Sequence, residues 1–281
     1  MALVGCNSGN GSRTLAVSVE PQRALLQEIT GDRFEITTLL ANGANPETYD
    51  PSMKTRMAVE NSAAYFTTGA MPFEKTIAEA LPASVTVVDC STGIEPIYGT
   101  HSHDHSHGHN HNHSHGHSHD SKGEPDPHVW ASVKNARVVA HNMLDAVIAL
   151  DPDGKDYYTE RYNRLDARLD SLDKAIAAKA AAGAQAFAVW HPSLSYFARD
   201  YGLEQIAVGF ENKEMSPKHL AEVVEQAKAK GVKVFFFQKE YDSRQAETLN
   251  NQMGTRLVTI NPLAYDWEAQ LTAVADALAQ P

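Results

Sequence analysis

The sequence predicts an α/β protein in which two lobes, each a parallel-type sheet flanked by helices, are joined by one long backbone helix. Three observations support this fold class. Short apolar runs alternate with helical patterns in both halves of the chain, as in βα units. A stretch of about thirty residues without a helix breaker separates the two series. The 281 residues, 42% of them hydrophobic, are enough to bury a sizeable core.

The first half of the chain contains four short apolar runs that are typical of buried strands. They cover residues 15–19, 34–40, 63–67 and 85–88. The segments between them, residues 21–30, 53–60 and 72–81, repeat apolar residues every three or four positions, which indicates helices with one buried face. We therefore assign residues 13–150 to a first α/β lobe.

The middle of the chain predicts one long helix. Residues 155–182 contain no Gly or Pro, and Leu165, Leu169, Leu172 and Ile176 recur at helical spacing. Gly183 is typical of a helix end. A helix of this length spans about 45 Å at 1.5 Å per residue. We therefore expect the linking segment, residues 151–183, to run along both lobes.

The second alternating series begins at residue 184 and predicts a second lobe over residues 184–281. Its expected strands cover residues 186–190, 205–208, 232–237 and 256–260. Ser216 and Pro217 are typical of a helix start, and Asp266 can cap the last helix. Ligands of such lobes bind at the carboxyl ends of the strands, so candidate ligands are sought there.

The net charge and the N-terminal residues indicate which classes of partner the protein can have. The formal net charge of −11 argues against a nucleic-acid partner, which needs clusters of Lys and Arg. No apolar run reaches the roughly 20 residues of a membrane-spanning helix. Residues 2–6 are typical of the end of a bacterial lipoprotein signal, and residues 7–12 of a flexible tether. Cys6 is therefore the expected lipidation site, and no disulfide with Cys90 is expected.

Between the expected first-lobe elements lies a segment with ten histidines that alternate with small or polar residues, within a loop that we place at residues 100–124. Both faces of this segment are polar, so we expect a disordered loop without a core face. Neutral imidazole is a common ligand of Zn²⁺, Cu²⁺ and Ni²⁺, and the segment is predicted to be an auxiliary metal-binding loop. The histidines are His101, His103, His105, His107, His109, His111, His113, His115, His117 and His119.

Two further histidines, His128 and His191, are candidate metal ligands. His128 follows Asp126 and Pro127 at the end of an irregular stretch, and His191 follows the apolar run that ends at Trp190. Each alone is more typical of a structural histidine. Because they occur in different lobes, each at a strand end or loop mouth, we expect them to form a pair of ligands.

A third candidate is Glu47, in the Gly- and Pro-containing loop of residues 42–51 that follows the second expected strand. Its carboxylate is well suited to share a divalent cation with imidazoles. Two histidines and one carboxylate leave a zinc ion one ligand short of a tetrahedron. Water, a loop histidine, Gln238, Glu240 or Asn261 are the candidates for the fourth position.

Several segments together resemble the zinc/manganese (cluster A-I) solute-binding proteins of bacterial ABC importers. They are residues 43–51, the His-rich segment, residues 126–130, residues 191–203 and residues 261–263, and the resemblance covers the chain from Leu15 onward. It implies a metal site in the cleft between two lobes, with His128 and His191 at the second and third ligand positions. A histidine at the third position and a His-rich loop favour zinc.

Two positions depart from this family. The family's first ligand is usually His, where this chain has Glu47. The Asp of the family's Asp-Pro-Leu segment is replaced here by Asn261. A carboxylate hardens the donor set and leaves Mn²⁺ or Fe²⁺ as alternatives to Zn²⁺. An amide in place of a carboxylate makes Asn261 a weaker candidate for the fourth ligand.

The resemblance implies a monomeric zinc-capturing protein of the periplasm or cell surface, without enzymatic activity, that delivers Zn²⁺ to the membrane permease of an ABC importer. Contact with the membrane is expected only through the lipid on Cys6. One alternative is a zinc hydrolase, but the sequence has no HExxH, GxSxG or P-loop motif. A second alternative is a metal buffer or adhesin whose working part is the His-rich loop.

Overall fold

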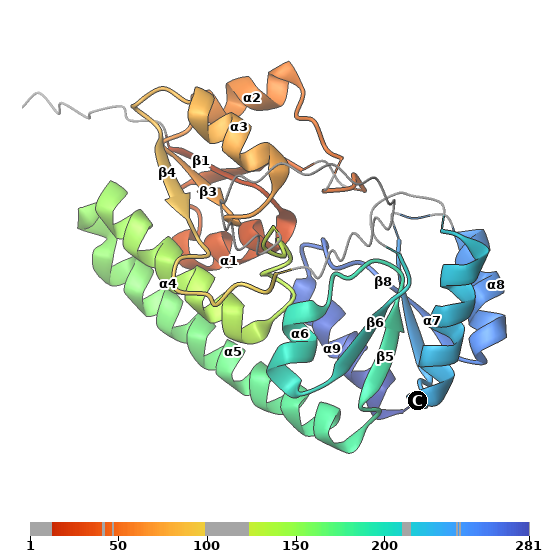
Figure 1. Cartoon of the computed structure of the whole chain (residues 1–281). Helices are drawn as coiled ribbons and strands as arrows, with labels where there is room; N and C mark the ends of the chain where they lie inside the picture. The colour runs from red at the N-terminus through yellow and green to blue at the C-terminus, as the bar shows by residue number, and fades with distance from the viewer. Residues whose placement is uncertain are drawn as a thin grey trace, which may run out of the picture.

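The computed structural model describes residues 13–40, 43–46, 48–98, 124–209, 215–239, 241 and 243–280. They form two α/β lobes that lie side by side along one long helix (Figure 1), which confirms the predicted fold class. The predicted auxiliary loop, residues 101–119, and the predicted lipidation site, Cys6, lie outside the described residues.

Each lobe contains a four-stranded sheet in which every described pairing is parallel. The first sheet has the order β2-β1-β3-β4 and the second the order β6-β5-β7-β8, so both lobes repeat one strand order. The strands are β1 (Thr14–Val17), β2 (Glu35–Thr38), β3 (Ala64–Thr67), β4 (Thr86–Asp89), β5 (Ala186–Val189), β6 (Glu204–Ala207), β7 (Val234–Gln238) and β8 (Arg256–Ile260). Ligands of such sheets bind where the strand order reverses, here between β1 and β3 and between β5 and β7.

Helices flank both sheets, and two of them begin at the caps that the sequence predicts. The helices are α1 (Glu20–Thr30), α2 (Met53–Glu60), α3 (Pro72–Ala80), α4 (Val133–Leu150), α5 (Lys155–Ala182), α6 (Ser195–Tyr201), α7 (Pro217–Ala229), α8 (Ser243–Met253) and α9 (Trp267–Ala279). The Ser216 side chain caps α7, and that of Asp266 caps α9. No helix in the described part of the chain has the length and apolarity to cross a bilayer.

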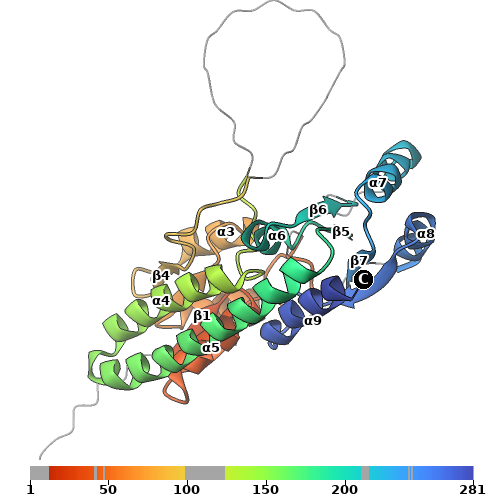
Figure 2. The same cartoon turned by 90° about the horizontal axis from the view of Figure 1, so that it is seen from below.

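The predicted long helix corresponds to α5, preceded by a single 3-10 turn at Pro152–Gly154. It packs against α1 and α4 of the first lobe and α9 of the second, and it extends along both lobes in Figure 2. Its buried residues are Tyr158, Leu165, Leu169, Ile176 and Ala180. One apolar cluster continues through this face from Phe66 in the first lobe to Phe236 in the second. The two lobes therefore share a core and are not joined by a flexible hinge.

We expect Leu169→Ala to lower the free energy of unfolding by about 2–5 kcal/mol, because it leaves a cavity where the side chain is fully buried. Leu172→Ala removes the same atoms from a partly buried position of the same helix and should cost less. Urea denaturation of both variants measures the difference. Equal losses would contradict the placement of the shared core along α5.

Candidate metal site between the lobes

His128 lies on a tight irregular turn just before α4. The Asp126 N–H donates to the Ile97 carbonyl at 2.7 Å, and Tyr98 and Pro125 form an antiparallel bridge. The Ala131 N–H donates to the His128 carbonyl at 3.0 Å, and the Ser132 side chain then caps α4. The helix thus begins at Val133, because residues 128–132 are used for this turn.

Asp126 orients the His128 ring. One carboxylate oxygen, Oδ1, lies 2.7 Å from His128 Nδ1 and also accepts the His128 backbone N–H at 2.9 Å. Although burial opposes ionisation of Asp126, the neighbouring His128 and its hydrogen bonds lower the carboxyl pKa below its usual value. An ionised Asp126 places the His128 proton on Nδ1, so that Nε2 presents a lone pair.

His191 follows β5 at the carboxyl end of the second sheet, and Gln238 holds its backbone. The Gln238 Oε1 accepts the His191 N–H at 3.2 Å, and its Nε2 donates to the Ser193 Oγ at 2.7 Å and to the His191 carbonyl. Gln238 is fully buried at the end of β7, which pairs with β5. Its amide therefore fixes the turn that carries the His191 ring.

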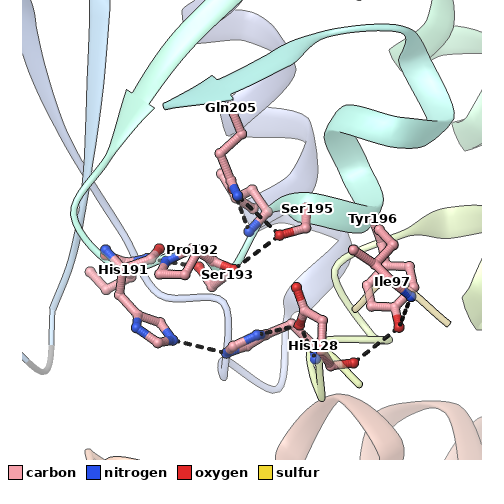
Figure 3. Close-up of polar contacts among 11 residues, drawn as sticks. Ile97, His128, His191, Pro192, Ser193, Ser195, Tyr196 and Gln205 are labelled. Carbon is pink, nitrogen blue, oxygen red and sulfur yellow. Dashed lines mark hydrogen bonds and ion pairs between the residues drawn. The ribbon is translucent and has the colours of Figure 1, made fainter. Parts of the chain in front are cut away.

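The two histidine rings meet between the lobes (Figure 3). His191 Nε2 lies 3.3 Å from His128 Nε2, and the ring centroids are 5.0 Å apart. Both side chains are buried, with relative exposures of 4% for His128 and 6% for His191. Residues that are 63 positions apart in the chain thus turn two ring nitrogens toward one point.

Aromatic side chains limit the movement of both rings. The Trp130 ring lies edge-on to His128 at 5.2 Å between centroids, and Tyr241 stacks on His191 at 5.7 Å. Burial and, to a lesser extent, the proximity of His128 lower the pKa of His191 to about 3, although Asp126 acts in the opposite direction. The His191 ring is therefore neutral at physiological pH.

The described residues on either side of Glu47 include one that contacts a neighbour of His191, although Glu47 itself lies outside the described residues. The Asn45 side chain donates to the Tyr241 hydroxyl at 3.4 Å, and Tyr241 is the residue that stacks on His191. Tyr49, on the other side of Glu47, donates from its hydroxyl to the Leu39 carbonyl at 2.6 Å and so ties the loop to the first lobe.

The candidate fourth ligands have different positions. Gln238 lies next to His191, but its amide is committed to the backbone and side chain of residues 191–193. Asn261 follows β8 at the carboxyl edge of the same sheet and is partly buried. Glu240 is outside the described residues. Within the described ranges, no group of three His, Cys, Asp or Glu side chains suited to a metal ion is present.

The roles of Asp126 and Gln238 in orienting the histidines were not predicted from the sequence. The signal for Asp126 was its spacing, two residues before His128, where a carboxylate can reach a ring nitrogen across a turn. Gln238 had no local signal, because its contact with His191 depends on the pairing of β5 with β7.

We expect the stability of the metal-free protein to depend on pH through His191. The unfolded chain binds a proton at this ring below about pH 6.5, whereas the folded protein does so only near pH 3. The free energy of unfolding therefore falls as the pH decreases through this window. Relative to His191→Gln, wild type should lose roughly 3 kcal/mol between pH 7 and pH 4. Urea denaturation with a chelator present measures it, and a pH-independent difference would contradict the burial of a neutral ring.

Comparison with known sequences relates the chain to zinc-uptake proteins. A family model described as "Zinc-uptake complex component A periplasmic" matches residues 15–280. The high-affinity zinc uptake system protein ZnuA of Bacillus subtilis is 28% identical over 252 residues, which cover 86% of this chain and 76% of that protein. The zinc-binding lipoprotein AdcA of Streptococcus pneumoniae is 26% identical over 270 residues, which cover 93% of this chain and about half, 52%, of AdcA.

Solved structures share the architecture. A crystal structure of a ZnuA deletion mutant with zinc bound has a TM-score of 0.82 at 27% identity and covers 96% of this chain and 100% of its own. A manganese-bound periplasmic metal-binding protein from Candidatus Liberibacter asiaticus has a TM-score of 0.77 at 19% identity, covering 94% and 99%, and shares the fold. Because the family match extends from β1 to α9, the chain belongs to the family of periplasmic zinc-uptake complex component A proteins.

Proposed function

We propose that this protein captures Zn²⁺ outside the cytoplasm and delivers it to the permease of an ABC importer. The observation that carries the proposal is the 3.3 Å separation of the His128 and His191 Nε2 atoms. Two nitrogens that bind one tetrahedral zinc ion at about 2.0–2.1 Å lie roughly 3.3 Å apart. The separation of the two nitrogens therefore matches the spacing of two ligands on one zinc ion.

The chemistry of the two rings supports the same role. Asp126 holds His128 in the tautomer with a free Nε2 lone pair, and burial keeps His191 neutral. Neutral imidazole is the form that coordinates metal. Two imidazoles favour zinc over harder ions, while a carboxylate from Glu47 would keep Mn²⁺ and Fe²⁺ as the alternative cargo.

Glu47 is the proposed third ligand. Its neighbour Asn45 contacts Tyr241 beside His191, and this contact supports a position of the loop close to the two rings. Asn261 and Glu240 remain the candidates for a fourth protein ligand. Gln238 is less suited, because turning its amide group toward the metal would break the hydrogen bonds that hold the His191 backbone.

The remaining parts of the proposal rest on the sequence and the relatives. AdcA is named a zinc-binding lipoprotein, which supports a lipid anchor on Cys6 and a location in the periplasm or at the cell surface. The histidines of residues 101–119 are proposed to gather additional, more weakly held ions. We propose a monomeric carrier without catalytic turnover and without affinity for nucleic acid.

The central test uses protein that lacks residues 101–119, titrated with zinc in a calorimeter. We expect one tightly bound zinc ion per chain. His128→Ala and His191→Ala should each remove most of that affinity, because each deletes one of two converging nitrogens. His141→Ala, at an exposed position of α4, is the matched control and should bind as the parent does. A second titration with manganese identifies the preferred cargo.

Loss of all zinc binding on deletion of residues 101–119 would assign the function to the His-rich segment and would make the protein a metal buffer. Retention of tight binding by both alanine variants would also refute the proposed site. Hydrolysis of ester or peptide substrates by the zinc-loaded protein would contradict the carrier assignment, since turnover has no place in a carrier.

A further inference from the structure

Tyr196 belongs to α6 of the second lobe, but its ring packs in an apolar cluster of the first lobe together with Val129 and Trp130. The side chain is only 1% exposed, and the Arg199 guanidinium lies 4.9 Å from the ring centroid. Tyr196 is thus a buried contact between the lobes, and it reaches the segment of chain that carries His128.

The Tyr196 hydroxyl makes two hydrogen bonds to the first lobe (Figure 3). It donates to the Asp126 carbonyl at 3.0 Å and accepts the Ile97 N–H at 3.3 Å. Ile97 and Asp126 are themselves joined by the hydrogen bond from the Asp126 N–H to the Ile97 carbonyl. One phenol group therefore completes the hydrogen bonding of the two backbone segments that precede and follow residues 99–123.

From these contacts we propose that Tyr196 is a positioning residue for zinc capture: through Asp126, it fixes the orientation and tautomer of His128. Asp126 bonds to Tyr196 through its carbonyl, to Ile97 through its N–H and to His128 through its carboxylate. A backbone held at both polar groups leaves the carboxylate little freedom. This inference rests on the proposed function, because it assigns a role at the same metal site.

Neighbouring contacts of α6 support this role. Three residues after Tyr196, Arg199 donates to the Glu95 carbonyl at 3.0 Å and to the Asn135 side chain at 3.0 Å. The exposed face of α6 thus anchors the segments on either side of Asp126, and Tyr196 is the residue of this helix that reaches Asp126 through the buried interior.

The test compares Tyr196→Phe with the parent protein lacking residues 101–119. Phenylalanine keeps the ring packing and removes only the hydroxyl. We expect zinc affinity, measured by competition with a chelator of known affinity, to fall at least about threefold, which is less than the roughly 10- to 100-fold loss expected for Asp126→Asn. Tyr201→Phe is the matched control: it removes a hydroxyl of the same helix that donates to Asp173 at 2.7 Å, and it should leave zinc affinity unchanged.

Two further readouts separate positioning from a general loss of stability. In the metal-free protein, ¹⁵N NMR of the His128 ring should show the Nδ1–H tautomer in the parent and in Tyr201→Phe, and a mixture of tautomers in Tyr196→Phe. If Tyr196 acts through Asp126, the double variant Asp126→Asn/Tyr196→Phe should bind zinc no more weakly than Asp126→Asn alone.

The outcomes distinguish this inference from the proposed function. If the parent binds no zinc, the proposed function fails. If the parent binds zinc and Tyr196→Phe has parental affinity and parental ¹⁵N shifts, the positioning role of Tyr196 is refuted while the proposed function stands. Equal losses for Tyr196→Phe and Tyr201→Phe, or additive losses in the double variant, would also refute it.

Discussion

The structure depends on the apolar core that continues through α5 and holds the two lobes at one fixed separation. Tyr158 and Leu165 of this helix and Phe187 of the second sheet belong to the same buried cluster as Phe66 of the first sheet. The 3.3 Å contact between the two histidine rings joins atoms from opposite lobes, so it exists only while this core keeps them in register. A protein with independently hinged lobes would have to order them each time that it bound an ion, at a cost in conformational entropy.

Hydrogen bonds between neighbouring segments then decide where each ring points. Asp126 and Gln238 act alike, because each belongs to the lobe of the histidine that it serves. Asp126 holds the His128 ring nitrogen and backbone N–H, and the buried Gln238 holds the backbone of His191. The aromatic rings of Trp130 and Tyr241 close the space beside the histidines. Such support lowers the entropic cost of binding, because the rings already face a common point.

The repeated strand order of the two lobes explains why the site lies where it does. In each sheet the first strand of the lobe lies between the second and the third, and the residues that serve the site follow carboxyl ends of strands. His191 follows β5, Gln238 ends β7, and the loop with Asn45 follows β2. His128 is the exception, since it lies on the turn before α4, and it reaches the site because Tyr196, Ile97 and Asp126 hold that turn against the second lobe.

The sequence by itself determined the α/β class, the long helix and the histidines worth examining, because these depend on local periodicity, on breakers such as Gly183 and on residue chemistry within a few positions. The tertiary structure decided the 3.3 Å approach of His128 to His191 and the interlobe contact of Tyr196. It also decided that the Gln238 amide hydrogen-bonds to the His191 backbone and is not free to act as a metal ligand. Each of these contacts joins residues more than forty positions apart, and no local pattern encodes a distance that depends on strand pairing and on the packing of two lobes along one helix.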